Sequence, residues 1–411
     1  MGQGFDQNFE LLFLGNLVPD SPEFNTAAFS RAGNMCQISL LQSFKQSGLS
    51  KIEVISVRPI PSFPRSDRVW IKAIEVVDRI GVKIKLLPFI NVTPLKQLGL
   101  GLLALIYVLS WGWRKRKVRD RVIYTYNISV PPGAFILFGA WLTKCKCVAM
   151  VYDLFVPGET VPNNMYFKLD YTLHKFLLPK FDALVAISAD IGQDFAPATP
   201  TIVIEGGINN SLAKKIVTAM EGNKTNNPGD HFIMSMAGRL DDINGIPIIL
   251  GAFELLIGDN YRLEIAGAGP LESEVLDAAR KDKRIKYHGF MSMDQVINMY
   301  KRSDILLNIR DTKKMNTKYF FPSKLMEYLC SGVLVISTCN ETLRRDYNGK
   351  MYFLLDETAL GLAKLLMSAT LLSSSERTAI GMRGQTYILS SKTWDIQGKK
   401  ILDFLSQSVS I

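Results

Sequence analysis

The segment Phe321–Ser337 contains the residues best suited to chemistry, because it predicts a carboxylate on a short helix between two buried strands. Pro322 and Ser323 are residues that start helices, and Gly332 is typical of a helix end. Glu327 then lies one turn into this helix. A carboxylate in buried surroundings requires a partner, and a ribose diol that donates two hydrogen bonds is a suitable one. A neighbouring Lys or Arg would satisfy the carboxylate equally well, so both interpretations stay open here.

Two glycine-containing turns follow predicted strands in the second half of the chain. Gly238 and Arg239 come directly after the strand expected at Phe232–Met236. An Arg at the C-terminal end of a parallel strand lies where open α/β sheets bind ligands, and its guanidinium suits a diphosphate. Gly267 and Gly269 form a Gly-x-Gly after a second strand, where backbone amides can approach a phosphate. Each turn is a weak signal alone, since ordinary surface turns contain the same residues.

An aromatic residue ends a third predicted strand. Phe290 follows Gly289 in a turn, directly after the strand expected at Ile285–Tyr287. Its ring could stack on a nucleotide base, although packing in the core is the commoner role of a Phe.

The elements that must position these residues alternate between strands and helices through nearly the whole sequence, which is typical of parallel sheets with crossover helices. In the first half, strands are expected at Leu11–Leu14, Ile52–Val57, Val122–Tyr126, Val148–Tyr152, Ala183–Ile187 and Thr201–Ile204, with helices at Arg31–Gln46 and Phe167–Leu178. In the second half, strands are expected at Phe232–Met236, Arg262–Ala266, Ile285–Tyr287, Ile305–Ile309 and Leu334–Ser337. The sequence therefore predicts an α/β protein with two doubly wound, Rossmann-like domains.

A polar stretch separates the two series of elements. Residues 206–230 contain the densest turn-forming sequence of the chain, so we expect an interdomain linker there. The predicted organisation is a first domain over residues 1–205, the linker, a second domain over residues 231–390, and a terminal segment over residues 391–411.

Charge and composition limit the partners. The 411 residues have a formal net charge of +10, which favours nucleic acid, a phosphorylated small molecule or an anionic membrane as partner. No nucleic-acid-binding motif is present, so nucleic acid is not expected. The five cysteines and three histidines lack metal-ligand spacing, so neither a metal site nor disulfides are expected. Reduced cysteines and a polar N-terminus without a signal-peptide pattern predict a cytoplasmic protein.

One segment indicates a membrane. Residues 98–113 are uncharged and apolar, contain Trp111 and Trp113, and are followed by the basic run at residues 114–117. Sixteen residues are fewer than the roughly twenty that span a bilayer. Three interpretations stay open: a buried core helix, an interfacial helix on an anionic membrane, and a transmembrane helix.

The motifs are more specific as a set than singly. Their order and spacing resemble the donor-binding domain of glycosyltransferase family 4, whose enzymes have the GT-B fold of two Rossmann-like domains facing across a cleft. The resemblance rests on Gly-Arg at residues 238–239, Gly-x-Gly-Pro at 267–270, Gly-Phe at 289–290 and Pro-Ser-Lys-x-x-Glu-Tyr at 322–328. It is strong from Ala237 to Ser337 and weaker elsewhere, and the terminal helix expected at Asp395–Leu405 resembles the family's last helix, which crosses back to the first domain.

The resemblance implies a set of donor-binding residues. It assigns the ribose to Glu327, the diphosphate to Arg239, the base to Phe290, and the donor's surroundings to Gly238, Gly267, Gly269, Tyr319 and Ser323. Two positions depart from the family: Tyr319 stands where the first of two Glu residues is usual, and Asn244 replaces the Lys that follows the Gly-Arg. Both departures remove charge. Lys324, in the first turn of the Glu327 helix, is expected to restore the cation beside Arg239.

The resemblance also implies a mechanism. The leaving diphosphate takes the acceptor's proton during transfer with retention, so no protein nucleophile, metal or other cofactor is expected and catalysis is mostly positioning and charge stabilisation. Asp153, after the strand Val148–Tyr152, is the candidate for orienting the acceptor or the sugar, although it suits a turn cap equally. Gly15 is expected to permit close approach of the donor to the first domain. The loop Arg310–Phe320 is expected to close over the substrate.

The function that follows is a cytoplasmic glycosyltransferase, peripheral on the inner face of the plasma membrane. It would transfer a sugar from a nucleoside diphosphate donor to a glycan or lipid-linked glycan acceptor in polysaccharide or cell-surface glycan synthesis. A nucleotide-sugar 2-epimerase of the same fold and a non-catalytic binding subunit are the alternatives. The small number of histidines disfavours the epimerase, whereas the changes at Tyr319 and Asn244 keep the non-catalytic subunit open.

Overall fold

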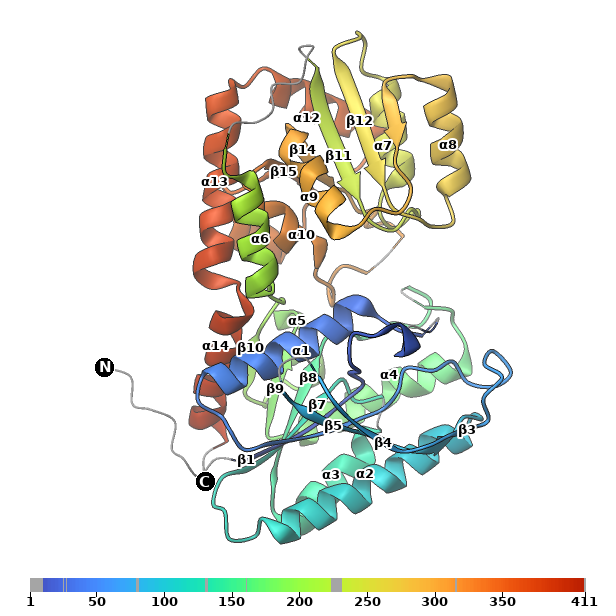
Figure 1. The fold of residues 1–411 in the computed structure, drawn as a ribbon, viewed down its shortest axis with the longest axis vertical. Helices are drawn as coiled ribbons and strands as arrows, with labels where there is room; N and C mark the ends of the chain where they lie inside the picture. The colour runs from blue at the N-terminus through green and yellow to red at the C-terminus, as the bar shows by residue number, and fades with distance from the viewer. Residues whose placement is uncertain are drawn as a thin grey trace. The chain divides into compact units, whose positions relative to one another are not determined.

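The computed structural model describes residues 10–24, 26, 28–78, 81–129, 132–159, 161–222, 231–314 and 316–409. The chain divides into two units, each with its own sheet and core (Figure 1). Unit 1 consists of Met1–Gly207, Tyr319–Phe321 and Trp394–Ile411, and unit 2 of Ile208–Lys318 and Pro322–Thr393.

Unit 1 is built on a mostly parallel sheet. Its strands are β1 (Glu10–Gly15), β2 (Ile52–Ser56), β4 (Ile74–Val77), β5 (Lys83–Leu86), β7 (Arg121–Tyr126), β8 (Lys146–Val151), β9 (Ala183–Ala186) and β10 (Thr201–Val203). They are ordered β10-β9-β8-β7-β1-β2-β5-β4, with only β4 antiparallel to its neighbour among these described strands. A separate antiparallel pair joins β3 (Trp70–Ile71) to β6 (Phe89–Ile90). Every residue of β1 is buried, as expected for a central strand covered on both faces.

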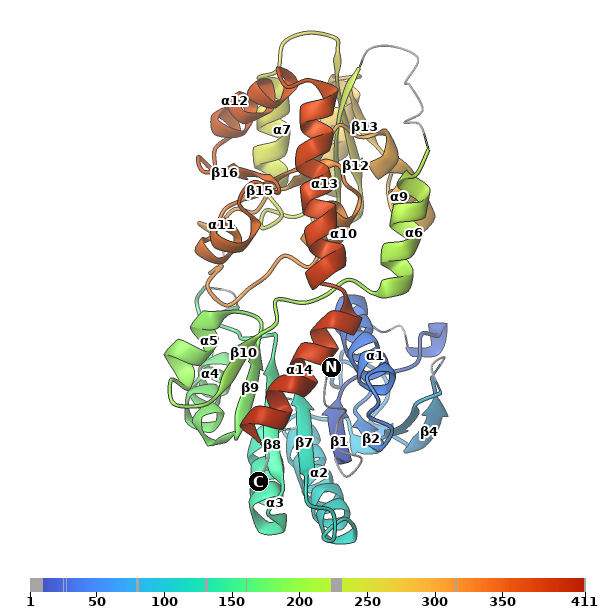
Figure 2. The same ribbon diagram turned by 90° about the vertical axis from the view of Figure 1, so that its left-hand side faces the viewer.

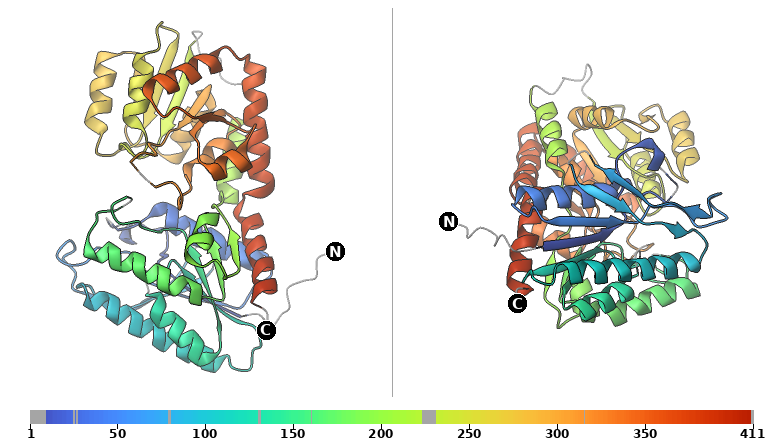
Figure 3. Two further views of the ribbon diagram at one scale, coloured as in Figure 1. Left: turned by 180° about the vertical axis from the view of Figure 1, so that it is seen from behind. Right: turned by 60° about the horizontal axis from the view of Figure 1, so that its bottom comes forward.

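Helices cover both faces of the unit 1 sheet. They are η1 (Pro22–Phe24), α1 (Arg31–Gln46), α2 (Leu95–Arg114), α3 (Gly133–Thr143), α4 (Met165–Leu177), η2 (Leu178–Lys180), α5 (Ala189–Phe195) and α14 (Trp394–Ser408). Helix α14 packs against α1, whereas α2 and α3 pack against each other and lie side by side (Figure 3). The last helix of the chain therefore contributes to the core of unit 1, through Trp394 and Leu402.

Unit 2 is a second doubly wound domain, with an all-parallel sheet ordered β13-β12-β11-β14-β15-β16. Its strands are β11 (Phe232–Ala237), β12 (Tyr261–Ala266), β13 (Ile285–Tyr287), β14 (Ile305–Asn308), β15 (Leu334–Thr338) and β16 (Tyr352–Leu354). Its helices are α6 (Asn210–Met220), α7 (Ile246–Glu254), α8 (Glu272–Lys281), α9 (Met293–Arg302), α10 (Lys324–Cys330), α11 (Glu341–Tyr347), α12 (Ala359–Thr370) and α13 (Ser374–Ser391). Helix α10 packs between α6 and α13 (Figure 2).

The predicted α/β class with two doubly wound domains is confirmed. The expected strands correspond to β1, β2 and β7 to β15. The boundary differs from the expected one. Helix α6 lies inside the predicted linker, residues 206–230, and packs against α9 and α10 of unit 2. Its N-cap Asn209 accepts hydrogen bonds from the amides of Ser211 and Leu212, so this polar stretch starts a helix. Residues 223–230 of the predicted linker lie outside the described residues.

Candidate functional site

The strand order of unit 2 reverses its direction at one position in the sheet. The chain runs from β11 outward to β12 and β13, and then returns to the other side of β11 to add β14, β15 and β16. The topological switch point therefore lies between the C-terminal ends of β11 and β14. Open α/β sheets bind their ligands at such a point. Gly238 and Arg239 follow β11 there, and Arg310 follows β14.

The glycines predicted to approach the donor hold two neighbouring turns together. Gly267 has a φ of 137°, and a Cβ on it would lie 1.8 Å from the carbonyl oxygen of Gly238. A Cβ on Gly269 would lie 2.2 Å from the carbonyl oxygen of Leu240. The amides of Gly238 and Leu240 donate to the carbonyls of Ala266 and Ala268, both at 3.0 Å. Glycine is thus required here by backbone packing, and this packing fixes the turn that carries Arg239.

Arg239 belongs to a hydrogen-bonded group on the switch-point loop. Its Nε donates to Oδ2 of Asp241 at 2.9 Å, and its side chain is 68% exposed. Oδ1 of Asp241 accepts from the backbone amide of Asn244 at 2.8 Å. Asn244 in turn accepts a hydrogen bond from the guanidinium of Arg310. An exposed guanidinium linked through Asp241 and Asn244 to a second guanidinium is an arrangement that can bind a phosphate.

Glu327 lies on α10, whose seven residues follow Ser323. Its Oε2 accepts from Nζ of Lys324 at 2.8 Å, and both side chains are about one-quarter exposed. The sequence left two partners open for Glu327, a ribose diol or a neighbouring cation, and in this structure the partner is the cation of Lys324. It also means that Lys324, predicted to bind the diphosphate, has its ammonium on the carboxylate. Ser323 makes no side-chain cap to the helix.

Tyr328 fixes α10 to the end of β11. Its buried hydroxyl accepts from the amide of Ala237 at 2.7 Å and donates to the carbonyl of the same residue at 3.0 Å. Its ring makes an edge contact with Tyr300, with centroids 5.3 Å apart. Burial raises the pKa of both phenols, so they stay neutral. The helix that carries Glu327 is therefore tied to the strand that ends in Gly238, a link that sequence reasoning missed.

Phe290 does not pack in the core. It follows Gly289, whose φ is 66°, and its side chain is 81% exposed at the C-terminal end of β13. The ring is thus accessible for stacking, which keeps the predicted role in base binding open.

Tyr319 belongs to unit 1. Its hydroxyl donates to the carboxylate of Asp194, and its ring makes an edge contact with Phe195, with centroids 5.5 Å apart. Burial and the Asp194 carboxylate raise the pKa of Tyr319. The residue in the place of the family's first Glu is therefore part of a packed contact with α5, whereas Glu327 lies in unit 2.

Asp153 is held by a residue from the neighbouring strand end. Its Oδ2 accepts from Nδ2 of Asn127 at 2.8 Å, and Oδ1 of Asn127 accepts from the amides of Tyr152 and Asp153 at 2.9 and 3.1 Å. Asn127 has a φ of 57°, a conformation that few residues other than glycine adopt. The residue is exposed at the surface, but nearby protein atoms still partly desolvate the Asp153 carboxylate and raise its pKa, and the Asn127 hydrogen bond opposes that shift.

Gly15, at the end of β1, has a packing role. A Cβ there would lie 2.2 Å from Oε1 of Gln37, which accepts from the amide of Asn16 at 3.0 Å. The absence of a side chain at Gly15 therefore makes room for Gln37 of α1, and the predicted approach of the donor to Gly15 stays a prediction.

Part of this chain matches a known protein family, and nearly the whole chain resembles solved structures. Residues 219–376, which include the whole group from Arg239 to Tyr328, match the family model for glycosyl transferases group 1. Sucrose-phosphate synthase from Thermosynechococcus elongatus has a similar structure, with 14% identity, a TM-score of 0.65, and coverage of 97% of this chain and 98% of that chain. The chain has the GT-B fold.

Two further GT-B structures are similar over their full length. HepE from Anabaena, solved in complex with UDP, has 12% identity and a TM-score of 0.66, with coverage of 97% of this chain and 100% of that chain. A glycosyltransferase from Rickettsia africae has 16% identity and a TM-score of 0.65, with coverage of 98% and 99%. No curated protein matches this chain in sequence. At such identities the structures establish the fold alone.

Proposed function

We propose that this GT-B protein is a retaining glycosyltransferase that moves a sugar from a nucleoside diphosphate to a glycan or lipid-linked glycan acceptor. The observation that carries the proposal is the group at the unit 2 switch point: an exposed Arg239 on the turn after β11 and the carboxylate of Glu327 on α10, a helix that Tyr328 ties to the end of β11. This group lies within the residues that match glycosyl transferases group 1. Neighbours of the same fold were solved with UDP and UDP-glucose, which supports a donor of that class.

The proposed chemistry requires positioning and charge rather than a protein nucleophile. Arg239 stabilises the charge that develops on the leaving diphosphate, whose oxygen accepts the acceptor's proton. Glu327 accepts hydrogen bonds from the ribose diol once Lys324 is displaced from it. Asp153, oriented by Asn127, is proposed to hold a hydroxyl of the acceptor or the sugar.

We also propose that unit 1 binds the anionic inner leaflet of the plasma membrane, with the protein cytoplasmic and peripheral. Among the described helices, α2 alone is long and apolar enough to cross a membrane, and 39% of it is buried. One of its faces is buried through Leu100, Ala104 and Val108, and Val108 lies against α3, where a Cβ on Gly139 would be 2.7 Å from it. A helix integrated into a domain in this way favours an interfacial position over a span.

Other apolar side chains of α2 are exposed, and α3, which lies beside α2 (Figure 3), carries exposed apolar side chains as well. The two helices approach closely at their C-terminal ends, where a Cβ on Gly112 would lie 2.5 Å from Thr143. Trp113 and Trp141, which are 60% and 70% exposed, therefore lie at the same end. The other exposed apolar residues of these two helices are Leu95, Leu98, Leu102, Ile106, Phe138 and Leu142. Exposed Arg116, Lys117 and Lys144 follow the two helices. Tryptophans with a basic cluster suit an anionic interface.

Vesicle sedimentation tests the membrane proposal. We expect the protein to pellet with phosphatidylglycerol vesicles at low salt and much less with phosphatidylcholine vesicles. The W113A/W141A variant should lose most of this binding. A control that removes exposed apolar residues of unit 2, I257A/L371A, should retain it, since these side chains are 93% and 87% exposed but lie outside α2 and α3. A wild-type protein that stays in the supernatant would contradict the membrane proposal.

A nucleotide-sugar panel tests the enzymatic proposal. Purified protein is screened with UDP-, GDP- and dTDP-sugars for thermal stabilisation and for release of the nucleoside diphosphate. We expect one donor class to stabilise the protein and to be hydrolysed slowly without acceptor. Epimer formation without acceptor would favour the 2-epimerase alternative, and the absence of any binding would favour a non-catalytic subunit.

A further inference from the structure

The family that the sequence resembles is expected to have a lysine at residue 244, where this chain has an uncharged Asn. The structure shows that an arginine side chain lies beside this Asn. Asn244 is on the loop after β11, and its side-chain oxygen accepts a hydrogen bond from Nη1 of Arg310. Arg310 comes from the end of β14, 66 residues later in the chain. A guanidinium thus lies next to the position where a lysine ammonium is usual.

The sheet register brings Arg310 to the switch point. Met234 pairs with Ile305 and Ser235 with Leu306. Strand β14 therefore lies beside β11, so Arg310 follows the strand next to the one that Arg239 follows, and the two side chains are linked through Asp241 and Asn244. The backbone of Arg310 is fixed by Thr338 at the end of β15, whose Oγ1 accepts from the Arg310 amide at 2.8 Å and donates to its carbonyl at 3.0 Å.

The loop after β11 is held against the same strand end. Gly245 has a φ of 65°, and a Cβ there would lie 2.7 Å from the side chain of Ile309. The amide of Asp311 donates to the carbonyl of Ile243 at 3.1 Å. Residues 243–245 and 309–311 therefore form one rigid junction between the two strand ends.

The charges in this junction explain why residue 244 is neutral. A lysine ammonium at hydrogen-bonding distance from the Arg310 guanidinium would place like charges in contact. Asparagine instead supplies an acceptor that orients the guanidinium. Burial lowers the pKa of Arg310 from its ordinary value and the Asp241 carboxylate opposes that shift, so the side chain stays charged.

We propose that Arg310 binds the donor's diphosphate together with Arg239, and that Asn244 orients it in place of the family's lysine. In this chain the second positive charge would therefore come from the end of β14, whereas the resemblance implies a lysine on the loop after β11. This assignment rests on the proposed function and adds Arg310 to the cations of the site; the predicted role of Lys324, which is paired with Glu327 in this structure, stays a prediction.

Calorimetric titration with UDP, GDP and dTDP tests the assignment, with the matching nucleoside as a probe that lacks phosphate. For the diphosphate that binds the wild type, we expect R310Q to weaken affinity about 10-fold to 100-fold, the loss expected for charge-assisted hydrogen bonds. Affinity for the nucleoside should be unchanged. The unliganded melting temperature of each variant separates a loss of fold from a loss of binding.

A second substitution makes the test specific. N244K should weaken diphosphate binding or stability on its own, because it adds a cation beside Arg310, whereas N244K/R310Q should recover affinity to within about threefold of wild type. Should R310Q not fold, R310K keeps the charge but loses the forked geometry, and we expect it to bind the diphosphate about 3-fold to 10-fold more weakly.

The outcomes distinguish this assignment from the function beneath it. Unchanged diphosphate affinity in R310Q or R310K, an equal loss for the nucleoside, or no recovery in the double variant would each overturn the role of Arg310 while leaving the enzyme intact. Failure of all three diphosphates to bind the wild type would overturn the proposed function and this role with it.

Discussion

The Tyr328 bridge offers the sharpest structural prediction, because one hydroxyl satisfies two backbone groups. The Y328F substitution removes a donor and an acceptor that bond Ala237 at 3.0 and 2.7 Å. Tyr328 and Ala237 are 1% and 4% exposed, so water cannot replace the lost partner easily. Each buried backbone group left unsatisfied costs about 1–3 kcal/mol, so the two groups give a loss of about 2–6 kcal/mol in unit 2. A loss near 3 kcal/mol lowers the melting temperature of a domain of this size by about 6–12 °C.

The assay combines denaturant unfolding with hydrogen exchange of peptides covering β11. We expect Y328F to unfold at a lower denaturant concentration than the wild type, and the amide of Ala237 to exchange its hydrogen faster. We also expect weaker binding of the nucleoside diphosphate that the wild type binds. Y124F is the matched control, because the buried Tyr124 hydroxyl has no hydrogen-bond partner among the described residues. Its stability should stay within about 0.5 kcal/mol of wild type. Equal stability of Y328F and Y124F would refute the reasoning.

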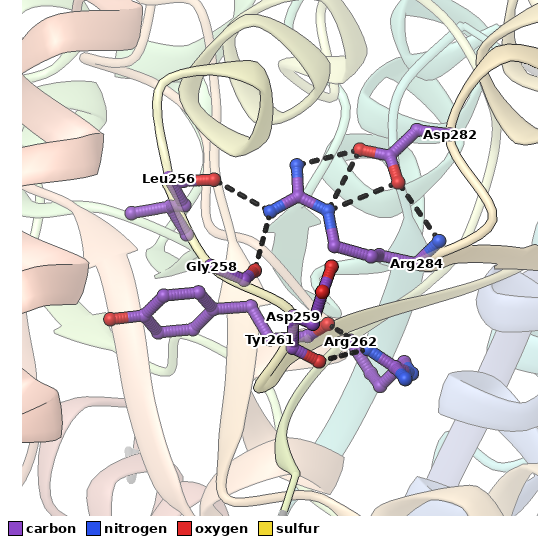
Figure 4. Close-up of polar contacts among 7 residues, drawn as sticks. All are labelled: Leu256, Gly258, Asp259, Tyr261, Arg262, Asp282 and Arg284. Carbon is purple, nitrogen blue, oxygen red and sulfur yellow. Dashed lines mark hydrogen bonds and ion pairs between the residues drawn. The ribbon is translucent and has the colours of Figure 1, made fainter.

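Two further predictions concern unit 2. G267A should destabilise the unit by about 3 kcal/mol in urea unfolding, because its Cβ would meet the Gly238 carbonyl at 1.8 Å. The control G349A, with a φ of 71° and open space around it, should cost only about 1 kcal/mol. Similar losses in the two variants would argue against the clash. Asp282 accepts from Arg284 at 2.7 and 3.0 Å (Figure 4), and these hydrogen bonds lower its pKa. Its stabilisation is therefore present above the ordinary Asp pKa and is lost as pH falls through the lower folded value. D282N should lose about 1–2 kcal/mol at pH 7, and its difference from wild type should shrink steadily as the pH falls below the ordinary Asp pKa, as measured by thermal unfolding. A difference that does not change with acid would contradict this.

The sequence predicts the long buried strands well, because their apolar runs are read locally. It misses β3, β4, β5, β6 and β16, of which β3 and β6 have two residues each and β4 is mostly exposed on the sheet edge. Short strands of this kind have too few residues for a periodic pattern. Their pairing partners supply the structure that their own sequence does not specify.

For the site, residue type was predictable and pairing was not. Glu327 was expected on a helix beside a strand, but whether Lys324 or a ligand satisfies it depends on side-chain geometry. Tyr328 reaches Ala237 across 91 residues, and Arg310 reaches Asn244 across 66. Such contacts depend on strand order, which places β14 beside β11 and which no local pattern encodes.

The most direct test of the central claim is whether the Glu327 carboxylate binds a ribose diol. Calorimetry compares the nucleoside diphosphate that binds the wild type with its 2′-deoxy counterpart, in wild type and in E327A. We predict that the wild type prefers the ribose form by about 10-fold or more and that E327A loses this preference, since removal of a charge-assisted hydrogen bond costs about 1.5–3 kcal/mol. Equal binding of both nucleotides by the wild type, or an undiminished preference in E327A, would contradict the account.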